Sequence, residues 1–356
     1  MRTEKIILNE ERNVTLTAYL QETGGRFDYI SARPGMLIIP GGGYQYCSER
    51  EADPPAMAFL KAGFQVFILN YSIGKDARWP NPLEDYEKAM ELIRDRAEEW
   101  KVYKDKVAVL GFSAGGHLAA CAATMAKNRP AAAVLGYAVT EKETVEKCEK
   151  TAPDAVSAVD RRTCPCFVFA TRDDSVVPVQ NSLSFVTALA KNGVSFESHI
   201  YAYGPHGFST GDTSVQYKDS HLCSRVPRWT EDCIGWLKDI LGDFGEKTMT
   251  DPACPRHVTG DYEDYLSLEC TLGYLRRYEK AADVMGPFLD WLTCHRQQVA
   301  DSIGPAAGEI TRREGMEGFF LMADNRTLRE VLSNTEFSRE EQAKLQEALE
   351  KIENQN

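Results

Sequence analysis

The segment LGFSAGGHLAA, residues 110–120, decides the fold class because it sets a serine between two glycines where the predicted structure changes. Gly111, Ser113 and Gly115 form a Gly-x-Ser-x-Gly pattern. The apolar, β-prone residues 107–110 predict a buried strand, and the alanine-rich residues after the serine predict a helix. Glycine is needed at both flanking positions because a Cβ atom there would collide with a neighbouring strand or helix. The segment therefore predicts a sharp strand-to-helix turn that presents the Ser113 hydroxyl.

The sequence around this turn alternates short apolar runs with helical patterns from residue 36 to residue 241. Such alternation predicts an α/β fold, a mostly parallel twisted sheet with helices on both faces. Strands are expected at residues 14–20, 36–39, 64–69, 107–110, 131–135, 166–170 and 195–201. Helices are expected from residue 81 and at residues 114–127, 182–191 and 229–241.

The pattern changes near residue 243, which predicts a catalytic domain at residues 1–243 and a separate helical C-terminal module at residues 244–356. No strand is expected in this module, residues 304–318 are expected to be irregular, and most of the acidic excess of the chain lies here. Ser338 and Glu341 have capping-box spacing. We favour a solvated helical cap over a module that binds a partner or forms a homo-oligomer. Helices are expected at residues 262–278, 281–295, 327–332 and 338–352.

The composition is that of an ordinary globular chain of 356 residues, 43% hydrophobic and 26% charged, with a net charge of −12. The acidic balance argues against nucleic-acid and anionic membrane partners. The apolar run at residues 6–8 is too short for a signal peptide. Ten scattered cysteines without a CxxC pair predict reduced thiols in the cytoplasm and no metal site. No cofactor-binding loop is evident, so no cofactor is expected.

A serine hydroxyl needs a base to act as a nucleophile, and two downstream loops offer one. His206 lies in the glycine-flanked loop YGPHGF, and Asp174 lies in TRDDSVVP after the strand at residues 166–170. Both loops follow carboxyl ends of predicted strands, where open α/β sheets build their sites. Asp174 is preferred because it has Asp-x-x-Val-Pro spacing, and Asp173 is the alternative or a loop cap. The predicted triad is Ser113, Asp174 and His206.

The glycine loop PGGGY, residues 40–44, follows a predicted strand and fits the second half of an oxyanion hole. One backbone donor is expected from Ala114, directly after the serine, and another from Gly42 or Gly43. The sequence does not choose between these two glycines. A phosphate-binding loop is disfavoured because no Gly-Lys-Ser/Thr follows.

Five segments in this order resemble the α/β-hydrolase esterases, and more closely the bacterial acetylesterase and acetyl-xylan-esterase-like branch. They are PGGGYQYCSERE, NPLEDYEKAMELIR, VAVLGFSAGGHLAA, DDSVVPVQNSLSFVTAL and HIYAYGPHGFS. The resemblance covers about residues 36–208 and implies the α/β-hydrolase fold for residues 1–243. It also implies the triad and oxyanion hole named above. Pro40 replaces the histidine of the related His-Gly-Gly-Gly loops, as is common in the carbohydrate-esterase-like branch.

Other residues near these motifs have structural interpretations. His117, one turn into the predicted helix, is expected to be a packed residue rather than a second base. Ser48 and Glu51 have capping-box spacing, so Glu51 is expected to be structural. Three aromatic residues fall in loops that could line the substrate pocket and stack on a sugar, or could simply pack the fold: Tyr44, Tyr71 and Trp79.

Together these features predict a serine carboxylesterase that removes small acyl groups, chiefly acetyl, from a carbohydrate or xylo-oligosaccharide ester. The expected partner is this small-molecule ester. Three alternatives are a peptidase or amidase on the same triad, a general short-chain carboxylesterase, and a non-enzymatic scaffold whose acidic helical tail drives assembly or binding.

Overall fold

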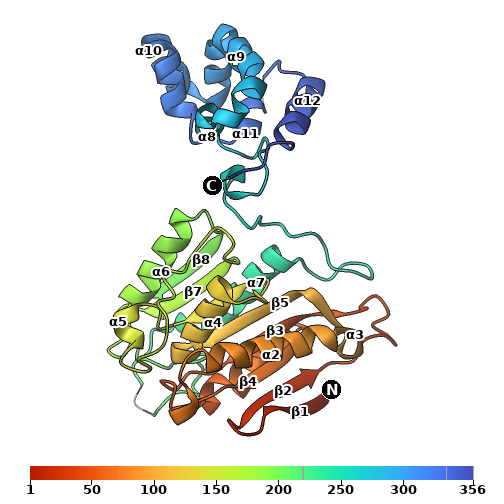
Figure 1. Cartoon of the computed structure of the whole chain (residues 1–356), viewed down its shortest axis with the longest axis vertical. Coiled ribbons are helices and arrows are strands. Elements are labelled where there is room, and N and C mark those ends of the chain that lie inside the picture. Colours follow the sequence, from red (N-terminus) through yellow and green to blue (C-terminus); the bar gives the residue numbers. More distant parts are fainter. Residues whose placement is uncertain (219, 334, 356) are drawn as a thin grey trace. The chain divides into compact units, whose positions relative to one another are not determined.

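The computed structural model describes residues 1–218, 220–333 and 335–355, and the chain divides into two compact units, Met1–Arg256 and His257–Asn356 (Figure 1). Each unit has its own hydrophobic core. Among the described residues, no helix combines the length and the apolar character that crossing a membrane requires.

The first unit is built on an eight-stranded sheet with the order β1-β2-β4-β3-β5-β6-β7-β8. The β1–β2 and β2–β4 pairs are antiparallel and all other pairs are parallel, so the sheet is mostly parallel, as the sequence predicts. Strand β1 was not predicted, because this edge strand is largely exposed and carries few apolar residues. The strands are β1 Arg2–Asn9, β2 Val14–Leu20, β3 Arg33–Ile39, β4 Gln65–Asn70, β5 Val102–Phe112, β6 Ala133–Gly136, β7 Cys166–Thr171 and β8 Phe196–Tyr201.

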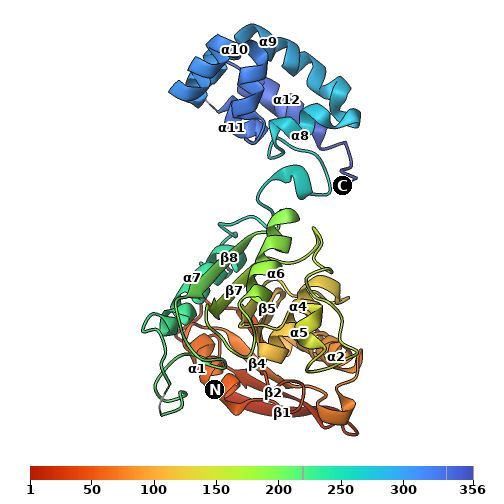
Figure 2. The same ribbon diagram turned by 90° about the vertical axis from the view of Figure 1, so that its left-hand side faces the viewer.

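Helices cover both faces of this sheet, with α2 and α4 on one side and α1 and α7 on the other (Figure 2). The first unit has a hydrophobic core on each face of the sheet. Side chains alternate along β3, so Leu37 and Ile39 face one core and Met36 and Ile38 face the other. The helices of this unit are α1 Asp53–Lys61, α2 Asn81–Asp95, α3 Ala97–Trp100, α4 Ser113–Met125, α5 Lys142–Val145, α6 Gln180–Lys191 and α7 Trp229–Leu241. Short 3₁₀ turns are η1 Glu49–Glu51, η2 Gly74–Asp76 and η3 Val226–Arg228.

The turn between β5 and α4 is packed as the glycine pattern predicts. A Cβ atom added to Gly111 would lie 2.3 Å from the carbonyl oxygen of Gly115. A Cβ atom on Gly115 would lie 2.3 Å from the carbonyl oxygens of both Ile39 and Pro40. Because neither position has room for a side chain, α4 begins directly against the end of β3.

The boundary between the units lies at Arg256, later than the predicted residue 243, because the intervening segment packs on the sheet unit. Thr250 N–H donates to the carbonyl of Asp243 (2.8 Å), and Met249 is buried in the core on the α7 side. Farther along, Ser195 N–H donates to the carbonyl of Arg256 (2.9 Å). The segment contains neither helix nor strand, so sequence periodicity could not assign it to the first unit.

The second unit is helical, and no strand is found in its described residues. The predicted capping box is confirmed, since Ser338 accepts from Glu341 N–H and the Glu341 side chain accepts from Ser338 N–H. Two predictions here are wrong: only residues 272–277 of the expected helix 262–278 are α-helical, and the region expected to be irregular is helix α10. The elements are η4 Gly260–Tyr262, α8 Leu272–Arg277, η5 Glu279–Ala281, α9 Ala282–Ile303, α10 Pro305–Ala323, α11 Leu328–Leu332 and α12 Arg339–Leu349.

The glycines of α10 explain the second error. A Cβ atom on Gly308 would lie 1.9 Å from the Asp301 carboxylate of α9, so this glycine permits close packing of two helices. Gly315, with φ of 66°, marks a kink between two helical segments. Glycines that indicated a loop in the sequence therefore serve helix packing and a bend.

Candidate active site

Ser113 lies at the junction of β5 and α4 with a positive φ of 52° and is 8% exposed. This backbone region is unfavourable for a residue with a Cβ atom, so the surrounding packing must hold it there. The helix places its N-terminal N–H groups, with their partial positive charge, beside the serine. The predicted strand–turn–helix is therefore present, with the Ser113 hydroxyl at its tip.

The structure brings Ser113, His206 and Asp174 into one chain of hydrogen bonds. The Ser113 hydroxyl lies 2.8 Å from His206 Nε2, and His206 Nδ1 lies 2.7 Å from the Asp174 carboxylate. The other Asp174 oxygen accepts from the N–H groups of Val176 (2.8 Å) and Val177 (2.9 Å). The carboxylate is thus fixed, and it orients the imidazole toward the serine.

Asp173, the alternative acid, has a different partner. Its carboxylate accepts from the N–H of Gly204 at 2.9 Å and so ties the loop after β7 to the loop that carries His206. This is the capping role that the sequence left open for it.

Ser113, His206, Gly42 and Gly43 line a cavity of about 820 Å³. Within the part of the chain that the structure describes, the N–H groups of Gly42 and Gly43 donate no hydrogen bond to a protein group, so both are available to a ligand. Ala114 N–H lies in the first turn of α4, where no helical carbonyl is available as an acceptor. All three predicted oxyanion donors remain candidates.

Glu51 does not take part in a capping box, because Ser48 makes no side-chain capping bond. Instead, the Glu51 carboxylate is buried and accepts two hydrogen bonds from separate segments. Gly41 N–H donates to one oxygen (2.9 Å) and the Tyr137 hydroxyl donates to the other (2.6 Å). Burial raises the pKa of Glu51, and these hydrogen bonds oppose the rise. Sequence spacing could not reveal these contacts, since Tyr137 is remote from Glu51 in the chain.

His117 is a packed residue, as predicted, and it also supports the glycine loop. Burial lowers the pKa of His117 to about 4, so the ring is neutral near pH 7. Its Nε2 lies 2.9 Å from the carbonyl of Pro153, and its Nδ1 lies 2.7 Å from the Tyr44 hydroxyl. The neutral ring therefore donates to Pro153 and accepts from Tyr44, which directly follows Gly43.

Of the two alternatives for Tyr44, Tyr71 and Trp79, the structure shows packing of the fold, and none of the three lines the cavity. Tyr44 and Tyr71 are buried in the core, and Trp79 packs on His117 with ring centroids 5.4 Å apart. Tyr71 donates from its hydroxyl to the carbonyl of Pro40 (3.0 Å), so it supports the loop from behind. A position in a loop did not reveal which way each side chain points.

Two other aromatic residues, Tyr46 and Tyr217, line the cavity, and they are 60% and 70% exposed. The Arg50 guanidinium lies over the Tyr217 ring, 4.3 Å from its centroid. Arg50 also donates from Nε to the carbonyl of Val215 (2.6 Å), which ties η1 to the loop that carries Tyr217. The cavity thus has an aromatic rim that the sequence analysis missed.

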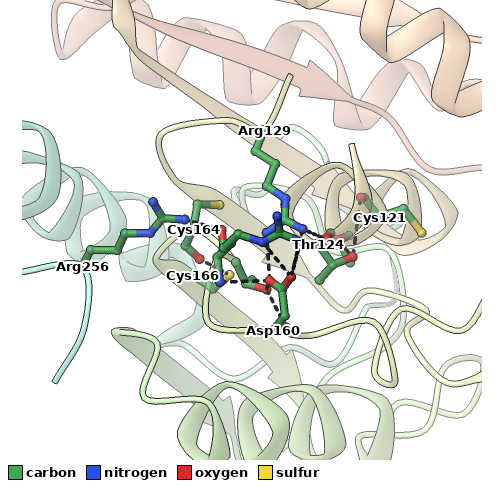
Figure 3. Close-up of polar contacts among 10 residues, drawn as sticks. Cys121, Thr124, Arg129, Asp160, Cys164, Cys166 and Arg256 are labelled. Atoms are coloured by element: carbon green, nitrogen blue, oxygen red, sulfur yellow. Dashed lines mark hydrogen bonds and ion pairs between the residues drawn. The ribbon is translucent and has the colours of Figure 1, made fainter. Parts of the chain in front are cut away.

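The segment Cys164-Pro165-Cys166 leads into the amino end of β7, and its Pro165 carbonyl accepts from Ala133 N–H at the start of β6. This edge of the sheet is the one opposite to Ser113. Arg129 donates to the Asp160 carboxylate (2.8 Å), and the two side chains point toward each other beside these cysteines (Figure 3). All ten cysteines lie in the described residues, and none forms a disulfide. Nor do the described residues contain a group of three or more histidine, cysteine or acidic side chains placed to hold a metal.

Comparison with known proteins assigns the family. The family model described as BD-FAE matches residues 30–131. An α/β hydrolase enzyme from a Medee basin deep-sea metagenome library is 40% identical, with a TM-score of 0.64, over 68% of this chain and 98% of its own. The chain belongs to the α/β-hydrolase family.

This α/β hydrolase is also 29% identical to an acetylxylan esterase from Xylanibacter ruminicola, over 58% of this chain and 45% of that protein. The acetyl ester-xyloside bifunctional hydrolase from Caldicellulosiruptor lactoaceticus is 30% identical, with a TM-score of 0.56, over 64% of this chain and 88% of its own. The chain spans about half the length, or less, of the curated relatives it matches.

Proposed function

We propose that this α/β hydrolase is a serine carboxylesterase that removes small acyl groups, chiefly acetyl, from a carbohydrate such as a xylo-oligosaccharide. The observation that carries the proposal is the hydrogen-bonded chain of Ser113, His206 and Asp174 at a cavity that Gly42 and Gly43 also line. The relatives named as an acetylxylan esterase and an acetyl ester-xyloside hydrolase support the acyl group and the substrate class.

In the proposed reaction, the Ser113 oxygen attacks the ester carbonyl while His206 Nε2 takes the hydroxyl proton. Asp174 holds the imidazole in the required tautomer and stabilises its charged form. The N–H of Ala114 and that of Gly42 or Gly43 stabilise the negative oxygen of the tetrahedral intermediate. His206 then gives its proton to the departing alcohol, and the carbon–oxygen bond of the ester breaks. Water, activated by His206, releases the acid and restores Ser113.

The rim of the cavity supports a carbohydrate as the alcohol part of the substrate. Exposed aromatic rings offer a flat apolar face to the C–H groups of a sugar, and Tyr46 and Tyr217 supply two of them. Glu49, Arg50 and Lys147 line the same cavity and offer charged partners for sugar hydroxyls. The cytoplasmic location and the assembly of a homo-oligomer through the helical unit stay predictions.

The first experiment is a series of p-nitrophenyl esters from acetate to octanoate, measured for the wild type and Ser113→Ala. We expect a preference for acetate in the wild type and loss of turnover in the variant. Better turnover of long acyl chains would favour a general carboxylesterase. Faster hydrolysis of an aryl amide than of the matching ester would favour an amidase instead.

A second experiment tests the sugar. Tyr217→Ala should raise KM for an acetylated xylo-oligosaccharide about fivefold, since one stacked ring contributes roughly 1 kcal/mol. The same variant should leave KM for p-nitrophenyl acetate within about twofold. Equal effects on both substrates would contradict recognition of the sugar by this ring.

A further inference from the structure

We propose that Glu51 is a positioning residue of the hydrolase reaction: its buried carboxylate joins the oxyanion loop to the loop that carries His206. The proposal rests on the proposed function only in assuming that Ser113 is the nucleophile of a hydrolase; it assumes nothing about the substrate. It goes beyond the triad and the oxyanion donors, because Glu51 acts through the residues that it holds.

The first contact fixes the oxyanion loop. Gly41 N–H donates to Glu51 at 2.9 Å, so this amide is not available to the substrate. A Cβ atom on Gly41 would lie 2.7 Å from the Glu51 carboxylate and 2.9 Å from Cβ of Ser113. The Gly41 backbone is therefore held between the carboxylate and the serine. Since Gly42 and Gly43 follow directly, the direction of their N–H groups depends on this contact.

The second contact reaches the histidine loop through Tyr137. The Tyr137 hydroxyl donates to Glu51 (2.6 Å) and accepts from Ser209 N–H (3.0 Å), three residues after His206. The Tyr137 ring packs edge-on against the His206 ring, with centroids 5.0 Å apart. Glu51 also lies 4.0 Å from where a Cβ atom of Gly207 would be. The base and the oxyanion donors are thus positioned from one carboxylate.

A neutral side chain could not make both contacts in the same way. Both Glu51 oxygens accept, which suits an ionised carboxylate, whereas glutamine has one acceptor and one donor group. Burying a carboxylate is costly, so its presence at the cavity wall needs partners that stabilise it. Glu51 is 4% exposed, lines the cavity and is not part of the triad.

The test compares Glu51→Gln with the wild type in kcat, KM and the rate at which a fluorophosphonate labels Ser113. Loss of one direct oxyanion donor costs about 10²–10³-fold in kcat, so misplaced donors should cost about 10–100-fold. We expect kcat for p-nitrophenyl acetate and the labelling rate to fall by a similar factor, with KM changed less than about threefold. Values of kcat and labelling rate within about threefold of the wild type would overturn the proposal.

Asp85→Asn is the matched control. Asp85 is fully buried and accepts from Ser72 N–H (2.8 Å) and Arg12 (2.6 Å), and its carboxylate hydrogen bonds to neither the oxyanion loop nor the histidine loop. Asp85→Asn should lower the thermal midpoint while leaving kcat unchanged. An equal loss of kcat in both variants would show that any buried charge has this effect, and would overturn the positioning role.

Tyr137→Phe decides the question if Glu51→Gln does not fold. This variant keeps the carboxylate and the Gly41 contact but removes the link to Ser209, so kcat should fall about tenfold with KM unchanged. An unchanged kcat would overturn the proposal. Labelling of Ser113 does not require the natural substrate, so a wild type that labels but cleaves no ester would refute the proposed function and still allow this test.

Discussion

The two units of this α/β hydrolase differ in how their backbones are held. Among the described residues, every non-glycine residue with positive φ belongs to Met1–Arg256, and four of them gather at the site. His257–Asn356 instead uses ordinary helix ends, with capping boxes at Thr327 and Ser338. Strained backbone persists only where the surroundings enforce it. The four residues are Tyr44, Ser113, Tyr137 and Ser209.

The difference teaches that the first unit stabilises unfavourable backbone at the nucleophile and at the buried residues that support the site. Ser209 and Tyr137 contact each other, and Tyr44 follows the oxyanion glycines. Such a unit should contain residues whose replacement changes activity and stability in opposite directions, whereas the helical unit should not.

The largest effect is expected at Ser113. Ser113→Ala and Ser113→Gly should both lower kcat by about 10⁴-fold or more, because the nucleophile is lost. Ser113→Gly should be more stable than Ser113→Ala by about 1 kcal/mol, because glycine adopts φ of 52° without strain. Chemical denaturation with a parallel ester assay checks both. Equal stability of the two variants would show that the positive φ at residue 113 costs no free energy of unfolding. Backbone strain would then not distinguish the two units.

A smaller effect is expected from the buried ring of His117. Its pKa in the folded chain is lowered to about 4 from 6.5, so below pH 6.5 the unfolded chain binds more protons than the folded one. The free energy of unfolding should therefore fall as the pH drops from 6.5 toward 4, by up to about 3 kcal/mol from this group. Urea unfolding of the wild type and His117→Gln at pH 7 and pH 4.5 measures it. The variant should lose less stability, and an identical loss would contradict a neutral buried imidazole.

In the helical unit, Ser338→Ala should cost about 1 kcal/mol, since it removes the side-chain half of a capping box. Esterase activity should not change, and Ser338→Asp should keep most of the stability because aspartate is also a good cap. Thermal unfolding followed by circular dichroism gives the stability. A loss of activity in Ser338→Ala would show that the units are coupled.

Little effect on activity is expected from removing the helical unit. A chain ending at Arg256 should keep kcat within about twofold, because residues 243–256 stay in place on the sheet. A chain ending at residue 243 should be less stable, because Met249 and the bonds of Thr250 and Arg256 are lost. Measuring mass in solution on the same samples tests assembly: a smaller oligomer after truncation at Arg256 would support self-association through the helices.

The sequence predicted most of the sheet because its central strands are buried on both faces and therefore appear as continuous apolar runs. Strand β1 lacked that signal because none of its residues is fully buried. The glycines of α10 led to the wrong prediction of an irregular region, because glycine occurs both in loops and where two helices pack closely. At the site, Ser113, Asp174 and His206 each lie in a short motif directly after a predicted strand. Each motif spans one short segment, so it can be recognised from a few neighbouring residues. The hydrogen-bonded chain among these three residues matches the triad proposed from the sequence.

The supporting residues were beyond sequence reasoning because their roles depend on contacts between distant segments. Glu51 was expected in a local capping box, yet it contacts Tyr137. The sequence left open whether Tyr44 and Tyr71 line the pocket or pack the fold; they are buried in the core, while Tyr217 lines the cavity. Side-chain direction in a loop is set by tertiary packing, which one sequence does not show.

The close approach of Gly115 to the end of β3 limits how the site can be redesigned. A side chain there would meet two carbonyl oxygens at 2.3 Å, so a library that randomises this codon should yield inactive clones apart from glycine. Tyr217 instead is 70% exposed at the rim. Libraries that aim at new substrates should therefore vary rim residues such as Tyr217. The contact between α4 and the oxyanion loop should be kept unchanged, because it holds the nucleophile and the oxyanion donors in place.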